Sequence, residues 1–230
     1  MMFFWDYTFF LLIPPLILAL YAQQKVKSTF QRFSRVMASS RRSAAEVARS
    51  ILDEAGVGEV RVEKVPGHLT DHYDPRKKVL RLSESVYSSS SLAALGVAAH
   101  EAGHAIQHHQ GYAPLYLRNA IYPVANLGSS LAFPLFFIGF LFSSQGPSIL
   151  MDLGILLFTG AVAFSVITLP VEFNASNRAL KILHQGGYLR DKELQGAKQV
   201  LKAAALTYVA ATAMAIMQLV RLLLLRESRR

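Results

Sequence analysis

The sequence predicts a mainly α-helical integral membrane protein, with about four transmembrane helices and a small cytoplasmic α+β region that contains a short antiparallel sheet. Three observations support this fold class. First, 52% of the 230 residues are hydrophobic, which is high for a soluble domain. Second, the apolar residues gather in four runs of about 20 residues, the length that crosses a bilayer. Third, two short segments between the runs alternate with a period of two, as strands do.

The four apolar runs divide the chain into alternating membrane and polar segments, which we expect to form a single membrane-embedded domain over residues 1–230. The first run has Asp6 near its outer end and a Pro14-Pro15 pair that predicts a kink. A cleaved signal peptide is the alternative for this run, but no basic segment precedes it. The last run contains Arg221, so it either crosses the membrane or lies at the interface. The four runs are 1–22, 123–144, 149–169 and 203–225.

The net charge of +9 gives an orientation. Six cations follow the first run, whereas the connection 143–148 has no Lys or Arg. Since cytoplasmic loops are enriched in Lys and Arg, the polar segments 23–122 and 170–200 are predicted to face the cytoplasm, and 143–148 to face outward. Basic and aromatic residues do not interleave as in a nucleic-acid surface, so we expect a lipid bilayer and no nucleic acid as partner. The cations are Lys25, Lys27, Arg32, Arg35, Arg41 and Arg42.

The first polar segment predicts a helix followed by two strands. Apolar residues recur at helical spacing over 43–55, and the period then changes to two over 60–65 and again over 78–82. We expect these two strands to pair antiparallel. The edge of the pair either holds a substrate as an added strand or is purely structural. His68 and His72 fall in the predicted loop between the strands, where a metal role is not favoured.

Residues 100–104 read His-Glu-Ala-Gly-His and lie within a predicted helix over 91–110, which the preceding serines can cap. Two histidines four residues apart share one helical face, so both imidazoles can bind one metal ion, with Glu101 beside them. The chain has no cysteine, so any metal must use imidazole and carboxylate ligands, as catalytic zinc sites do. His108 and His109, further along this helix, are either additional ligands or polar residues near the helix end.

Two histidines leave zinc short of protein ligands, and Glu172 is the candidate for the third. It begins a predicted polar helix after the hairpin of the second and third apolar runs, whose two crossings return the chain to the side of His104. Small residues follow it at helical spacing, facing Gly96, Ala99 and Gly103 of the metal helix. The alternative is an exposed glutamate in the first turn of a helix. The small residues are Ala175, Ser176 and Ala179.

With these motifs and flanking apolar helices, nearly the whole chain resembles the YugP-like neutral zinc metallopeptidases of bacteria. That family is similar to the membrane gluzincins, which include the HtpX protease and the CAAX prenyl proteases. The resemblance implies a zincin-like catalytic region in a multi-pass protein of the bacterial plasma membrane. It also implies one zinc ion held by His100, His104 and Glu172, with Glu101 as general base. Gluzincins usually carry an aspartate four residues after the ligand glutamate, where this chain has Ser176.

The expected function is therefore zinc-dependent endopeptidase activity on membrane or membrane-proximal proteins and peptides at the cytoplasmic face. Tyr208, His184 and Arg178 lie downstream, where gluzincins usually place the group that stabilises the transition state. The alternative is a non-catalytic zinc-binding membrane protein, either a pseudoprotease or a metal carrier. A carrier would need several ionisable residues within its apolar runs, and this chain has only three, all near the ends.

Overall fold

The computed structural model describes residues 7–143 and 146–229, and the chain divides into two compact units. Asp6 and the start of the first apolar run lie outside the described residues. We call one unit the helical unit, formed from 1–22, 116–169 and 207–230, and the other the mixed unit, formed from 23–115 and 170–206.

Within the residues that the structure describes, four helices are long and apolar enough to cross a membrane, which confirms the predicted number. The third and fourth are longer than the apolar runs, because the polar segments continue the same helices. In particular, the helix that contains Glu172 begins at Ile149 and continues through Pro170, so Glu172 does not begin a separate helix as predicted. A proline removes one backbone donor, which a long helix tolerates. The helices are η1/α1 (Tyr7–Leu12 and Ile13–Phe33), α5 (Ala113–Phe142), α6 (Ile149–Gln185) and α7 (Asp191–Glu227).

The proline pair of the first run marks a change of helix type. The chain is a 3-10 helix through Leu12 and becomes α-helical at Ile13, so Pro14 and Pro15 lie in the first turn of α1. A proline costs little there, because the first backbone N–H groups of an α-helix have no intrahelical partner. The proline pair, which predicted a kink, thus lies where the α-helix begins.

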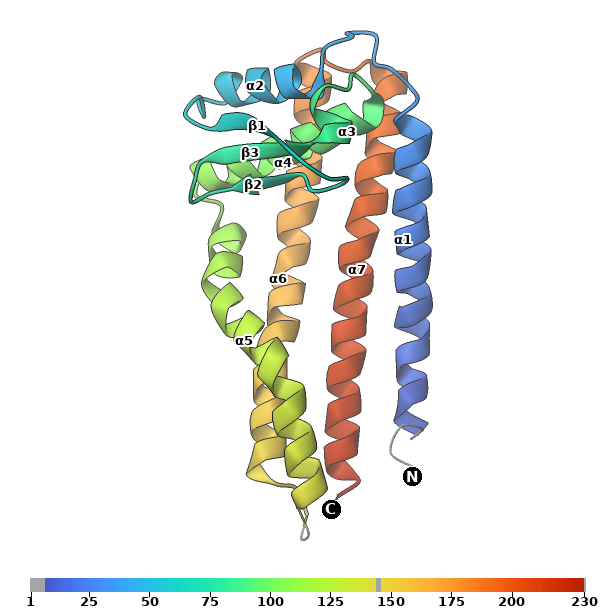
Figure 1. Ribbon diagram of the computed structural model, residues 1–230, viewed down its shortest axis with the longest axis vertical. Coiled ribbons are helices and arrows are strands. Elements are labelled where there is room, and N and C mark those ends of the chain that lie inside the picture. The colour runs from blue at the N-terminus through green and yellow to red at the C-terminus, as the bar shows by residue number, and fades with distance from the viewer. Residues whose placement is uncertain (1–6, 144–145, 230) are drawn as a thin grey trace. The chain divides into compact units, whose positions relative to one another are not determined.

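In the helical unit, long stretches of α1, α5, α6 and α7 run beside one another (Figure 1). Helix α6 approaches α5 closely at Gly154, where an added Cβ would lie 2.7 Å from the carbonyl oxygen of Ala132. Small residues at such contacts allow membrane helices to pack through van der Waals contact. Helix α7 meets α6 through a hydrogen bond of 3.2 Å from Thr212 Oγ1 to the carbonyl oxygen of Ser165.

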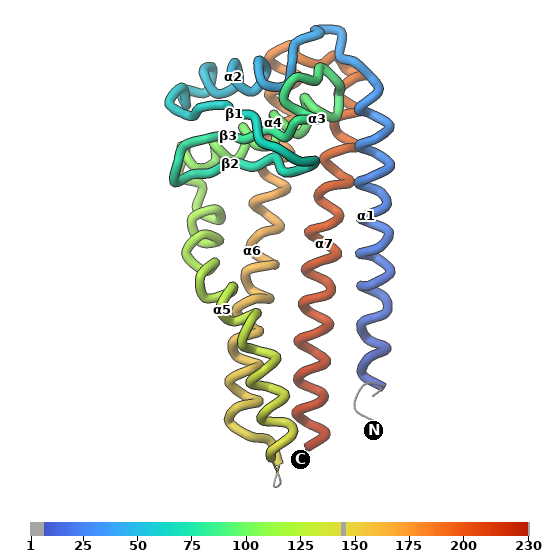
Figure 2. The backbone as a smooth tube through the Cα atoms, in the orientation of Figure 1, coloured from blue at the N-terminus to red at the C-terminus, as the bar shows by residue number. Residues whose placement is uncertain are grey.

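The mixed unit contains a three-stranded sheet in the order β1-β3-β2. Strand β3 pairs parallel with β1 and antiparallel with β2, so the prediction of an antiparallel pair of two strands was wrong. The predicted loop between them itself contains β2, which runs back along β3 and leaves β3 parallel to β1 (Figure 2). The strands are β1 (Arg61–Val65), β2 (His72–Asp74) and β3 (Val79–Ser83).

Helices α2 (Ala44–Glu54), α3 (Glu84–Tyr87) and α4 (Leu92–His109) complete this part of the mixed unit. The predicted helix over 91–110 is confirmed, and the side chain of Ser91 accepts a hydrogen bond from the backbone N–H of Ala94 as its N-cap. In Figure 1 the strands lie side by side, with α2 next to β1 and α4 behind the sheet.

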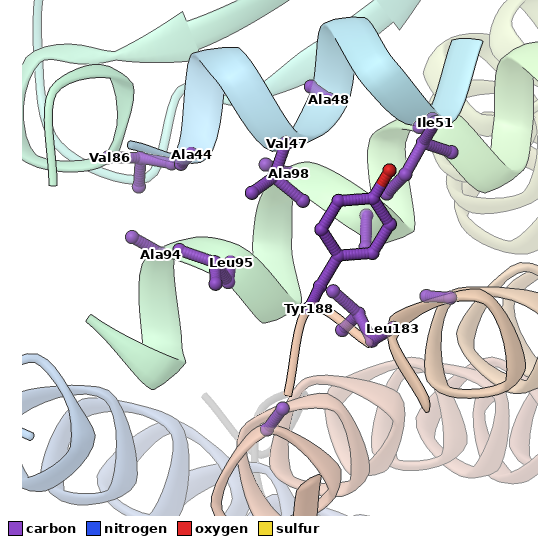
Figure 3. Packing of buried hydrophobic residues seen from close by; sticks show 14 of the residues in the cluster. Ala44, Val47, Ala48, Ile51, Val86, Ala94, Leu95, Ala98, Leu183 and Tyr188 are labelled. Atoms are coloured by element: carbon purple, nitrogen blue, oxygen red, sulfur yellow. The ribbon is translucent and has the colours of Figure 1, made fainter. Parts of the chain in front are cut away.

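The core of the mixed unit lies between α2 and α4 and includes the end of α6 (Figure 3). Its side chains are mostly small or β-branched, so the helices pack closely, and the metal motif lies on a helix buried over most of its length. Members drawn in Figure 3 include Val47, Ile51, Leu95, Ala98, Leu183 and Tyr188.

Candidate metal centre

The two histidines of the motif lie on adjacent turns of α4, as their spacing predicts. The ring centroids of His100 and His104 are 4.7 Å apart with the ring planes at 83°. Their side chains are only 14% and 13% exposed. The two imidazoles are therefore mostly shielded from bulk water.

Glu172 joins the two histidines from α6. Its Oε2 atom lies 3.3 Å from Nε2 of His100 and 3.6 Å from Nε2 of His104. The three ligand atoms lie within 4.8 Å of one another, and within residues 7–143 and 146–229 they are the one group of three or more such side chains. The residue is only 3% exposed and lies well inside α6, which does not fit the alternative of an exposed first-turn glutamate.

A glycine lets the two helices come close enough for this meeting. An added Cβ on Gly103 would lie 2.9 Å from the carbonyl oxygen of Ala175 and 3.4 Å from its Cα. Side-chain carbon cannot be accommodated that near to a backbone without a shift. The backbone contact of α4 with α6 therefore rests on Gly103, which lies next to His104 in the sequence.

Each histidine has a hydrogen-bond partner on its other nitrogen. Nδ1 of His100 lies 3.1 Å from Oγ of Ser176, and Nδ1 of His104 lies 3.0 Å from Oε1 of Gln107. Both partners leave Nε2 on the side of Glu172. Partners of this kind orient metal-binding imidazoles. Ser176, which stands where gluzincins usually carry an aspartate, thus contacts the first histidine of the motif.

The sequence analysis assigned no such contact to Gln107. The signal that could have found it is spacing: a glutamine three residues after a histidine lies on the same face of a helix and is within reach of its ring. Its complete burial, by contrast, depends on α6 and is not readable from α4 alone.

The electrostatics of the site favour positive charge. Burial lowers the pKa of His104, but its hydrogen bond with Glu172 and the charge of Glu101 outweigh burial, so the pKa is raised above its usual value. The donor set of two imidazole nitrogens and one carboxylate is one that catalytic zinc sites use. The three residues therefore fit a zinc ion by type, proximity and charge.

Glu101 lies beside this group and is half-buried. Its negative charge contributes to raising the pKa of the His104 imidazole. A carboxylate so placed can exchange protons with a water molecule near the three ligands. The role of Glu101 as general base stays a prediction.

The three candidate stabilisers occupy different environments. Arg178 donates from Nε to Oδ1 of Asn174 at 2.7 Å and from Nη1 to Oε1 of Gln110. The side chain of His184 is 55% exposed and is 12 residues beyond Glu172 on α6, or about 18 Å along the helix axis. Tyr208 belongs to the helical unit. The identity of the stabiliser stays a prediction.

The remaining histidines considered in the sequence do not join the three ligands. His72 lies in β2, and its ring nitrogens contact the carbonyl oxygen of Thr70 and Nη1 of Arg81. Nδ1 of His108 lies 3.0 Å from the hydroxyl of Tyr73. Neither contact is a metal-binding arrangement. Within the described parts of the chain, the one group of three or more side chains that could hold a metal ion is therefore the group on α4 and α6.

Comparison with known proteins agrees with this geometry. Residues 8–227 match a family described as "Putative neutral zinc metallopeptidase". The chain belongs to this family. It is also 51% identical over 216 residues to a protein of Bacillus subtilis (strain 168) named "Putative membrane protease YugP", and the match covers 94% of this chain and 95% of that protein. No solved structure matches the chain.

Proposed function

We propose that the protein is a zinc-dependent endopeptidase of the bacterial plasma membrane that hydrolyses peptide bonds of membrane or membrane-proximal proteins and peptides. The observation that carries the proposal is the meeting of His100, His104 and Glu172 within 4.8 Å, with Glu101 on the same helix turn. Membership of a zinc metallopeptidase family, the relative named as a membrane protease and the four apolar helices all support it.

The residues of the site have distinct tasks in this reaction. His100, His104 and Glu172 would hold the zinc ion, which when bound supplies a Lewis acid that polarises a carbonyl and makes water more acidic. Glu101 takes a proton from the attacking water and returns it to the leaving amine. Ser176 and Gln107 orient the imidazoles through their Nδ1 atoms.

Replacing Glu101 tests the reaction. We expect purified wild type to hold zinc and to cleave an unfolded protein such as casein. Glu101→Gln should keep the zinc, because Glu101 is not a ligand, but should lose at least about 100-fold in cleavage rate. Glu84→Gln is the matched control, since Glu84 has a side chain that is 60% exposed and pairs with Lys64. It should cleave as wild type does.

The outcomes also separate the alternative function. Undiminished cleavage by Glu101→Gln contradicts the proposed role of this residue. Zinc-loaded wild type that cleaves neither casein nor unfolded membrane proteins favours a non-catalytic zinc-binding protein, such as a pseudoprotease or metal carrier. The carrier has little support in the apolar runs, where ionisable residues are few.

We place the site at the cytoplasmic face because the cations that follow the first apolar run belong to the polar segment that carries the motif. A topology reporter fused in the region of Lys77 should therefore report a cytoplasmic location. A reporter fused after Gln145 should report an extracytoplasmic location. The opposite pair of results would reverse the orientation and move the substrates to the other side of the membrane.

A further inference from the structure

Gln107 is completely buried and lies one turn after His104 on α4. Its Nε2 atom lies 2.9 Å from the backbone carbonyl oxygen of Val171 and 2.9 Å from Oδ1 of Asn174, both on α6. A backbone carbonyl can only accept a hydrogen bond, so the NH₂ group of the amide must face α6. The amide oxygen, Oε1, then necessarily faces Nδ1 of His104 at 3.0 Å.

This orientation determines which nitrogen of His104 carries a proton. An amide oxygen can only accept, so Nδ1 must be the donor. In the neutral imidazole the lone pair is then on Nε2, the atom that lies 3.6 Å from Oε2 of Glu172. His100 differs, because the hydroxyl of Ser176 can donate or accept and so does not select a tautomer.

The same side chain ties the two helices of the site together. Val171, whose carbonyl oxygen accepts from Gln107, directly precedes Glu172 in the sequence. Asn174 also accepts from Nε of Arg178, which reaches back to Oε1 of Gln110 at the end of α4. Hydrogen bonds thus cross from α4 to α6 and return, which fixes the spacing between the histidine helix and the glutamate helix.

We propose that Gln107 is a positioning residue of the metal centre, which selects the metal-binding tautomer of His104 and holds α6 in place beside Glu172. The inference rests on the proposed function, because it concerns the same zinc site. It assigns to one buried amide both the chemical form of one ligand and the backbone position of another. Arg178 extends this hydrogen-bond network, because it donates to Asn174 on α6 and to Gln110 at the end of α4.

Two variants of the detergent-purified full chain separate the parts of the proposal. Gln107→Met keeps the length of the side chain but removes its acceptor and its donors. Gln107→Glu keeps an acceptor for His104, but a carboxylate cannot donate to Val171. The control is Tyr73→Phe, which removes a bond of equal length, 3.0 Å, to Nδ1 of His108 on the same helix, outside the three ligands. Chelator competition gives the zinc affinity, and the visible spectrum of the Co²⁺-substituted protein reports ligand geometry.

We expect Gln107→Met to bind zinc about 10- to 100-fold more weakly than wild type and to change the cobalt spectrum. Gln107→Glu should lie between the two, and Tyr73→Phe should match wild type. Wild-type affinity and spectrum in Gln107→Met overturn the inference, as does an equal loss in Tyr73→Phe.

If Gln107→Met does not fold, Gln107→Glu decides, and the inference fails if this variant has wild-type affinity and spectrum. Wild-type zinc binding in the Gln107 variants overturns this inference alone, whereas a wild type that binds no zinc overturns the proposed function as well. The two failures are therefore distinguishable.

Discussion

Helix α6 carries one carboxylate in each unit of the molecule, and the two are neutralised differently. Asp152, in the helical unit, is bound by Nε and Nη2 of Arg226, and the side chains are 49% and 25% exposed. Glu172, in the mixed unit, has a side chain that is only 4% exposed and faces the imidazoles of His100 and His104. One helix thus holds an exposed ion pair in one unit and a buried three-residue cluster in the other.

This difference in partners indicates which of the two carboxylates is suited to bind a metal ion. A guanidinium is always charged, so the chain itself supplies the cation for Asp152. An imidazole supplies a cation only when it is protonated. The cluster around Glu172 can therefore exchange protons for a metal ion, whereas the pair of Asp152 with Arg226 cannot. The positive charge that a metal ion could replace is therefore that of the protonated imidazoles of His100 and His104, in the mixed unit.

The largest effect is expected where α4 meets α6. In Gly103→Ala the new Cβ would lie 2.9 Å from the carbonyl oxygen of Ala175, so one backbone must shift. Overpacking of this kind costs about 1–3 kcal/mol, and the shift should separate the histidines from Glu172. We expect a lower unfolding temperature of the metal-free protein and weaker zinc binding, measured by thermal unfolding and chelator competition.

Gly96→Ala is the matched control on the same helix. There the new Cβ would lie 3.4 Å from Cβ of Ala197, an ordinary contact distance, and alanine has a helix propensity up to about 1 kcal/mol better than glycine. We expect this variant to be as stable as wild type or more stable, with unchanged zinc binding. Equal behaviour of the two variants would show that the close approach at Gly103 does not hold the site together.

The smallest effect concerns a third kind of carboxylate, at the turn between β2 and β3. The backbone N–H of Lys77 lowers the pKa of Asp74 most; burial raises it, but the N–H of Arg76 and the side chain of Arg81 add to the lowering. A lowered pKa in the folded state stabilises the fold at a pH above the unfolded value, and this contribution is lost as the pH falls toward the folded value. Asp74→Asn should therefore cost about 1 kcal/mol or less at neutral pH.

The pH dependence of this variant identifies the cause. The difference in unfolding temperature between wild type and Asp74→Asn should shrink as the pH falls below the ordinary aspartate pKa toward the lowered pKa of the folded state, because the unfolded chain takes up a proton on Asp74 at a higher pH than the folded protein does. A difference that stays constant with pH would mean that the charge of Asp74 contributes nothing. Since Asp74 lies in the sheet, zinc binding should not change.

Local patterns in the sequence predicted the parts of the fold that depend on neighbours along the chain. The N-cap at Ser91, the helix over α4 and the four apolar helices follow from spacing and composition. The parallel pairing of β1 with β3 could not be predicted in this way, because it depends on β2, a strand of three residues with no clear alternation. The unbroken course of α6 through Pro170 was missed for the opposite reason, since proline is a strong local signal that the packing of a long helix overrides.

The candidate site shows the same division. The spacing of His100 and His104 is local, and their shared face on α4 follows from it directly. The meeting with Glu172 depends on residues about 70 positions further along the chain, and the sequence could only offer it as a candidate. The contact of Gln107 with Val171 requires both helices in place, so the role of this glutamine became visible only in the structure.

The central claim is that His100, His104 and Glu172 hold a zinc ion, and the most direct test is the zinc content of paired variants of α6. Wild type and Asp152→Asn, purified in parallel and dialysed, should each retain one zinc ion per molecule. Glu172→Gln should retain none, because it removes the buried carboxylate that faces both imidazoles. Full zinc content and wild-type affinity in Glu172→Gln would contradict the claim.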